Sequence, residues 1–71
     1  MSKPTAAKFG KNVNRLRNLA NLTQEQLSER ADISRRYLQM IEAGKYVPTI
    51  EVASRLRMAL KLTWDELLRG I

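Results

Sequence analysis

The sequence predicts an all-α domain of five helices built around one compact core. Apolar residues recur at the three- and four-residue spacing of amphipathic helices, capping residues separate these runs, and no segment alternates with the period of two typical of a strand. A chain of 71 residues suits one domain. We therefore predict a single domain over residues 6–71 after a flexible lead at residues 1–5, and we see no internal repeat.

The first helix is predicted over residues 6–20. Phe9, Val13 and Leu16 lie on one face of it, at positions i, i+4 and i+7. Asn21 suits the left-handed backbone conformation in which many helices end.

The second helix is predicted to begin after Thr23. In the segment Thr-Gln-Glu-Gln the threonine hydroxyl can accept from the backbone three residues on, and Gln26 can reach back, which is a capping box. Leu27 and Ala31 then form a short inner face.

A tight turn at Asp32 and Ile33 leads to Ser34, which can cap a third helix that ends at Gly44. Two short helices joined by so brief a turn indicate a helix-turn-helix over residues 23–44.

Thr49 is predicted to open a fourth helix after a loop at residues 45–48. The inner face of this helix consists of apolar residues at helical spacing: Val52, Ala53, Leu56, Ala59 and Leu60. A second capping box, at residues 63–66, opens a brief fifth helix that closes near Gly70.

The chain is strongly basic, with 13 lysine and arginine residues against seven acidic ones and a formal charge of +6. The first acidic residue, Glu25, follows a purely basic segment that contains Lys3, Lys8, Lys11, Arg15 and Arg17. An anionic partner is therefore expected, with nucleic acid favoured over an acidic membrane surface. A basic charge that serves solubility alone is the alternative.

The absence of cysteine and histidine removes the commonest zinc ligands, the thiol nucleophiles and the usual general base. We expect no metal, no cofactor and no enzyme activity, and no small-molecule ligand is evident. No segment approaches the roughly 20 apolar residues of a membrane span, and the first residues lack the apolar stretch of a secretion signal. A cytoplasmic protein is expected.

The third helix is predicted to have two different faces. Leu38 and Ile41 share a narrow arc with Ser34 on the core side. The opposite face carries Arg35, Arg36, Gln39, Met40 and Ala43. An arginine can bond the O6 and N7 atoms of guanine, a glutamine the edge of adenine, and a methionine can lie against a thymine methyl. This face predicts base reading, although a solvated arginine pair is the alternative for any one helix.

Residues 22–49 resemble a known family. The matching features are the Leu-Thr-Gln-Glu-Gln-Leu segment, Ile33-Ser34 before the third helix, Ile41-Glu42-x-Gly44-Lys45 at its end, and Pro48-Thr49 at the start of the fourth. This pattern resembles the helix-turn-helix of Cro and the phage repressors, the XRE family, and weaker similarity extends from Phe9 to Leu68.

The resemblance implies a compact repressor-like domain that acts as a sequence-specific transcription regulator, either a repressor or a controller protein. Such a protein would bind a palindromic operator in double-stranded DNA as a homodimer, in the nucleoid. The alternative is an antitoxin or adaptor module that uses the fold mainly for protein–protein interaction.

Residue by residue, the resemblance implies base contacts from four positions: Arg35, Arg36, Gln39 and Met40. It implies backbone contacts from another four: Gln24, Ser34, Lys45 and Tyr46. For Gln24, simple helix capping is the alternative, and at Met40 a polar base reader is more common, so any contact there should be apolar.

An ion pair between Arg17 and Glu42 is also implied, and it would tie the first helix to the end of the third. Arg17 on a DNA phosphate is the alternative. Asp32 stands where the family usually has glycine in the turn, and aspartate tolerates a positive φ better than most residues.

The C-terminal helix region is the predicted dimer patch. Apolar residues gather there at the end of a small chain: Trp64, Leu67, Leu68 and Ile71. For Trp64, a lid over the protein's own core is the alternative.

Overall fold

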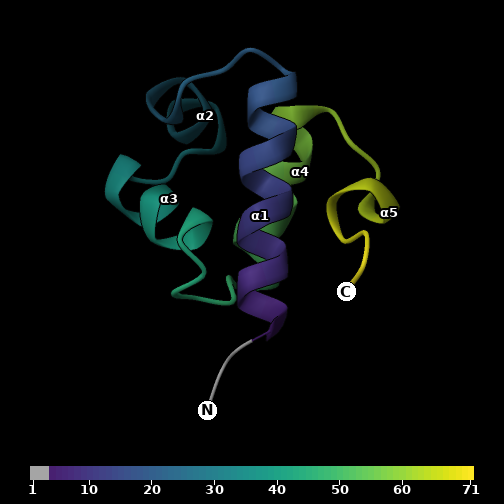
Figure 1. The fold of residues 1–71 in the computed structure, drawn as a ribbon. Helices are drawn as coiled ribbons and strands as arrows, with labels where there is room; N and C mark the ends of the chain where they lie inside the picture. Colours follow the sequence, from purple (N-terminus) through teal and green to yellow (C-terminus); the bar gives the residue numbers. More distant parts are fainter. Residues whose placement is uncertain (1–3) are drawn as a thin grey trace.

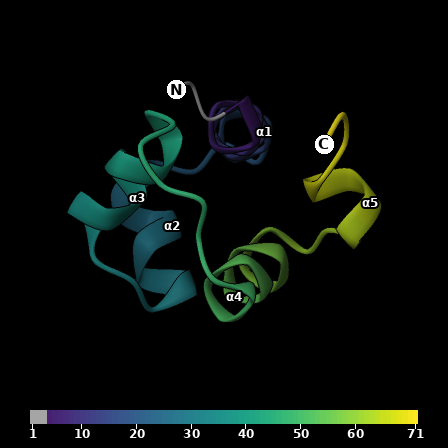
Figure 2. The same cartoon turned by 90° about the horizontal axis from the view of Figure 1, so that it is seen from below.

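The computed structural model describes residues 4–71, and it contains five α-helices and no strand within that range. The helices are α1 (Pro4–Leu19), α2 (Gln24–Ala31), α3 (Arg35–Glu42), α4 (Ile50–Leu60) and α5 (Trp64–Leu67). In Figures 1 and 2, α1 runs along the front of the molecule with α4 behind it, α2 and α3 lie on one side, and α5 lies on the other. The predicted all-α class and the order of five helices are confirmed.

Helix α1 begins earlier than the sequence suggested. Pro4 and Thr5 belong to the helix and not to the predicted lead, because proline lacks only an N–H that has no partner in a first helical turn. Residues 1–3 of that lead lie outside the described residues. No helix in the described part of the chain is long and apolar enough to cross a membrane.

The predicted caps are confirmed at four helix starts. Each cap hydroxyl accepts a hydrogen bond from the backbone N–H three residues on, and the four residues are Thr23, Ser34, Thr49 and Thr63. Both predicted capping boxes are complete, with Gln26 and Glu66 bonding back to the N–H of their caps. These bonds satisfy backbone donors that a helix start leaves without partners.

Three residues other than glycine adopt the left-handed conformation at helix ends. Asn21 has φ 59° and Asp32 has φ 55°, as predicted, while Lys61 has φ 57° without having been identified from the sequence. Asp32 therefore adopts the left-handed conformation at the turn position where the family usually has glycine.

The core lies between the helices and includes Val13, Leu27, Leu38, Ile41 and Leu56 as fully buried side chains. Leu67 is also fully buried, so its assignment to an exposed dimer patch is wrong. It lies on the inner face of α5 and belongs to the same core cluster. The amide of Asn12 on α1 donates to the carbonyls of Leu67 and Arg69, at 2.9 Å each, and fastens this end of the chain onto α1.

Helices α1 and α3 approach each other closely at Gly10. A Cβ atom at that position would lie 2.9 Å from the carbonyl oxygen of Glu42, and closer still to that of Ile41. The backbone of α3 therefore rests directly on α1, with no side chain from residue 10 between them.

The same bend between two consecutive helices, which we name a corner, occurs twice in the chain. This finding corrects the expectation of no repeat. Residues 17–27 form the first corner and residues 57–67 the second. Both have arginine, leucine, threonine and leucine at the same spacing, and both have a left-handed residue at the bend. The few identities at separated positions, within otherwise different residues, explain why sequence inspection missed the repeat.

The two corners also share their hydrogen bonds. The N–H of Leu22 donates to the carbonyl of Arg17, and Arg17 Nη1 donates back to the carbonyl of Leu22 at 2.9 Å. Arg57 and Leu62 exchange the equivalent bonds, with Arg57 Nη1 3.1 Å from the carbonyl. The arginine therefore closes the bend in each corner.

Candidate nucleic-acid interface

The outer face of α3 lies in solvent, as the predicted division into two faces requires. Arg35, Arg36 and Gln39 are exposed and Met40 is half-buried, whereas Leu38 and Ile41 are fully buried. The hydroxyl of Ser34 accepts from the N–H of Tyr37 at 3.0 Å and fixes the start of the helix. The structure thus brings the four predicted base-contacting residues onto one helix.

Arg17 and Glu42 form a nearly buried ion pair. Arg17 Nε donates to Glu42 Oε2 at 2.7 Å and Nη2 donates to Oε1 at 3.1 Å. The two side chains are only 12% and 5% exposed. Because two parallel bonds fix both groups, the pair sets the position of α3 relative to α1.

Glu42 accepts two further hydrogen bonds at Oε1, from the amides of Asn14 at 2.9 Å and Gln24 at 3.1 Å. Burial alone would raise the pKa of the Glu42 carboxyl, but the hydrogen bonds from Arg17, Asn14 and Gln24 outweigh it and lower that pKa below its ordinary value. Glu42 therefore stays ionised at neutral pH and joins α1, α2 and α3. Sequence reasoning missed Asn14, although it lies one turn before Arg17 on α1.

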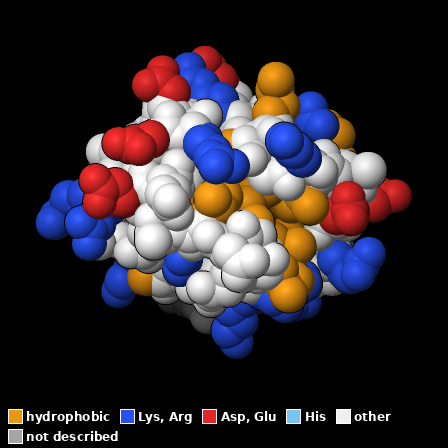
Figure 3. Space-filling model, turned by 90° about the horizontal axis from the view of Figure 1, so that it is seen from above, with side chains coloured by type: hydrophobic (Ala, Val, Ile, Leu, Met, Phe, Trp, Pro, Cys, Tyr) orange, Lys and Arg blue, Asp and Glu red, His pale blue; other side chains and the backbone are white. Residues whose placement is uncertain are grey.

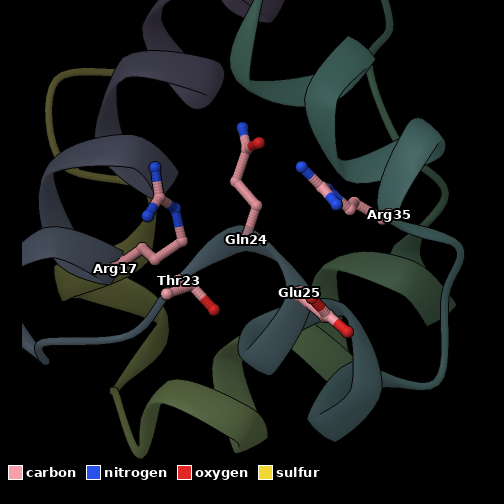
Figure 4. Close-up of a pocket in the computed structure, with 5 residues that line it drawn as sticks. All are labelled: Arg17, Thr23, Gln24, Glu25 and Arg35. Atoms are coloured by element: carbon pink, nitrogen blue, oxygen red, sulfur yellow. The ribbon is translucent and has the colours of Figure 1, made fainter.

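Gln24 lies at the first position of α2 and is not the cap, since Thr23 and Gln26 fill that role. Its amide points into an open pocket lined by Arg17, Thr23, Glu25 and Arg35. Figure 4 shows this amide between the two arginine side chains, with Glu25 directed the other way. One amide hydrogen goes to Glu42, and the second remains available for a ligand. Together with the positive end of α2, this pocket suits an anion.

The segment after α3 places Lys45 and Tyr46 in solvent. Gly44 ends the helix with φ 78°, and the N–H of Lys45 donates to the carbonyl of Met40 at 3.0 Å. The ring of Tyr46 packs on that of Tyr37 with centroids 6.0 Å apart. Sequence reasoning did not identify this contact, because it joins two residues whose spacing matches neither helix nor strand.

A second feature, which we name the apolar groove, involves the C-terminal region. It is lined by Thr5, Phe9, Val47, Pro48, Ile50, Ala53, Trp64, Leu68 and Ile71. Figure 2 looks at the end of the molecule where these elements meet. Ile50 is 79% exposed and Val47 is 57% exposed. Trp64, Leu68 and Ile71 of the predicted patch line the groove, whereas the buried Leu67 does not.

The arrangement of two short helices, with the second held outward on a rigid support, defines a helix-turn-helix DNA-binding domain. A family model described as helix-turn-helix matches residues 13–67. The chain belongs to this family, in its XRE type of DNA-binding transcription regulators.

Two curated relatives are similar to the chain. The HTH-type transcriptional activator BcrR of Enterococcus faecalis is 39% identical over 62 residues, which cover 87% of this chain and 30% of BcrR. The uncharacterized HTH-type transcriptional regulator y4dJ of Sinorhizobium fredii is 38% identical over 58 residues, covering 82% of this chain and 75% of y4dJ. The chain thus spans less than a third of the length of BcrR.

Two solved structures share the fold. The restriction-modification controller protein C.AhdI from Aeromonas hydrophila superposes with a TM-score of 0.87 and 28% identity, over 92% of this chain and 98% of that one. A mutant of the restriction-modification controller protein C.Esp1396I has a TM-score of 0.88 and 19% identity, over 94% of this chain and 85% of that one. At that identity the second likeness concerns the fold alone.

Proposed function

We propose that this protein regulates transcription by binding a palindromic operator in double-stranded DNA as a homodimer, and that it acts in the nucleoid by occupying promoter DNA. The observation that carries the proposal is the outer face of α3, which presents two arginines and a glutamine on a helix held by the Glu42 network. C.AhdI is a restriction-modification controller protein, and its likeness over nearly the whole chain supports a DNA-binding regulator.

In this proposal Arg35, Arg36 and Gln39 bond base edges in the major groove, and Met40 makes an apolar contact. The exposure of Arg35, Arg36 and Gln39 on one helix, whose inner face is buried, supports these assignments. Met40 is half-buried, which suits a van der Waals contact better than a polar one.

The backbone contacts are assigned to residues at the two ends of the helix-turn-helix. Gln24 offers an amide hydrogen and the N-terminus of α2, while Lys45 and Tyr46 lie exposed just beyond α3. Ser34 contributes from the start of α3, where its hydroxyl already accepts a hydrogen bond and can still donate one. Such contacts position the protein on the duplex without reading sequence.

The homodimer is assigned to the apolar groove. Its most exposed large apolar residues are Val47, Ile50 and Ile71, and a second copy would cover them. A two-fold dimer reads two half-sites about one helical turn apart, which gives a small domain the selectivity that one helix lacks.

The first experiment is selection from a randomised duplex pool at moderate salt, followed by sequencing of the retained DNA. An enriched inverted repeat is the expected result. Retention without enrichment would contradict sequence reading and leave a general DNA-binding surface.

Single substitutions then test the α3 assignments. Arg35→Ala and Arg36→Ala should each cost about 1 to 3 kcal/mol on the selected site, with little change on random DNA. Equal losses on both DNAs would make them phosphate contacts. Arg30→Ala serves as the matched control, because it removes an exposed arginine that is assigned neither to DNA nor to the apolar groove.

The exposed apolar groove also favours a second candidate, in which the protein is an antitoxin or adaptor that mainly binds another protein. A salt series separates the two, because binding to phosphates weakens steeply as salt rises while an apolar protein interface responds little.

A further inference from the structure

Helix α1 carries a row of basic side chains that the site described above does not use. Lys8, Lys11 and Arg15 are all exposed, and we name them the α1 stripe. Their spacing of three and four residues aligns them along the outward face of the helix. Over that length the helix rises about 10 Å, at 1.5 Å per residue.

The α1 stripe forms no ion pair within residues 4–71. Helix α1 contains no aspartate or glutamate, and the ion pairs within residues 4–71 join Arg17 to Glu42 and Arg55 to Glu51 instead. In Figure 3, the edge of the molecule formed by α1, at the bottom of that view, shows basic side chains and no acidic one. A row of like charges without partners favours an anionic surface over a protein's own packing.

The stripe also borders the candidate DNA interface. Gly44, directly before Lys45, lies against Ala7, and Ala7 precedes Lys11 by one turn on the same face of α1. The α1 stripe therefore lies on a helix whose surface adjoins the segment that carries Lys45.

We propose that the α1 stripe binds phosphates of the duplex flanking the half-site, outside the base pairs that α3 reads. This inference rests on the proposed function. Successive phosphates of one strand advance about 3.4 Å along the duplex axis, so a row about 10 Å long can face roughly three of them. Lysine ammonium groups on flexible stems act as point charges, which suits contacts that do not depend on sequence.

The test compares two triple variants that each remove three positive charges. The stripe variant is Lys8→Gln with Lys11→Gln and Arg15→Gln. The control variant is Arg30→Gln with Lys61→Asn and Arg69→Gln, which are exposed residues on other parts of the molecule. Lys61 is replaced by asparagine because its backbone is left-handed. Circular dichroism and thermal melting first establish that both variants fold.

Binding is then measured from low to high salt on two random-sequence duplexes, one of half-site length and one longer by about a helical turn at each end. Each lost phosphate contact should reduce the slope of log K against log salt by about 0.9, so the stripe variant should lose about 2.7 per protomer on the long duplex. The short duplex and the control variant should show much smaller changes.

An unchanged slope in the stripe variant would overturn the inference, as would equal losses in both variants, which would indicate a general effect of net charge. If the stripe binds an acidic protein and not DNA, the stripe variant should bind DNA as tightly as the wild-type protein does. Failure of the proposed function is distinguishable, because it would appear as no enrichment in the selection experiment, or as a wild-type protein that binds neither duplex.

Discussion

The first corner, residues 17–27, and the second corner, residues 57–67, have the same backbone design but face different surroundings. In the first, Arg17 reaches the carboxylate of Glu42 on α3. In the second, the guanidinium of Arg57 lies 5.2 Å from the centre of the Trp64 ring, and its buried Nε has no hydrogen-bond partner among residues 4–71. The bend itself is thus independent of the carboxylate.

The residue after each cap differs in the same way. Gln24 follows Thr23 and lines the open pocket that suits an anion, whereas Trp64 follows Thr63 and lines the apolar groove. The comparison teaches that arginine, leucine and threonine specify the corner, while the residue after the cap and the partner of the arginine determine what the corner can bind.

The largest expected difference between the corners concerns their arginines. Arg17→Met leaves the nearly buried Glu42 carboxylate without its charged partner, and we expect a loss of about 3 to 5 kcal/mol in the free energy of unfolding. Urea denaturation measures it. Adding Glu42→Leu should recover most of the loss, since no charge is then stranded. A loss below about 1 kcal/mol would show that the pair acts like an exposed one.

The partner of the first corner, Glu42, should contribute to the pH dependence of stability, beside Glu66 of the second corner, whose pKa is lowered by its hydrogen bonds with Thr63. The pKa of Glu42 is lowered in the folded protein, so its contribution is complete above its ordinary value of 4.5 and is lost as pH falls through the lower folded value. Glu42→Gln should flatten the loss of stability below pH 4.5 in denaturation curves. Arg57→Met should leave that loss unchanged, and a flattening there would contradict the assignment.

A smaller effect is expected for Arg57→Met itself. It removes one hydrogen bond to the carbonyl of Leu62 and the contact with Trp64, but it strands no carboxylate, so about 1 kcal/mol is expected in the same denaturation assay. A loss as large as that of Arg17→Met would mean that the two corners are energetically equivalent.

The residues after the caps should separate two activities, and the effects that distinguish them are expected on binding. Gln24→Ala should weaken binding to all DNA sequences alike, by about 1 kcal/mol, and leave self-association unchanged. Trp64→Ala should weaken self-association in sedimentation experiments. A sequence-selective loss in Gln24→Ala would show that its proposed role is wrong.

The elements that sequence reasoning predicted depend on neighbours within a few residues. The capping boxes at Thr23 and Thr63 and the left-handed bend at Asp32 are local signals, and the structure confirms each of them. Helix α1 begins at Pro4, before its predicted start. Proline is compatible with the first turn of a helix but does not by itself mark where the helix begins, so the sequence did not fix this boundary.

The features that were missed join residues far apart in the chain. Leu67 looked exposed because it lies near the end of the sequence, yet Asn12 holds its carbonyl against α1. The apolar groove combines Val47 and Ile50 with Trp64, and only the packed helices bring them together. No local pattern specifies such contacts, which explains why the sequence identified only some of the residues that line the groove.

Gly10 has a consequence for how binding specificity can change. Because the backbone of α3 rests directly on α1 there, the orientation of α3 depends little on any flexible side chain. The exposed residues proposed to read DNA, Arg35, Arg36 and Gln39, are separate from this contact. On the proposed assignment, exchange of those exposed residues should change the target sequence while the thermal stability of the domain stays nearly constant.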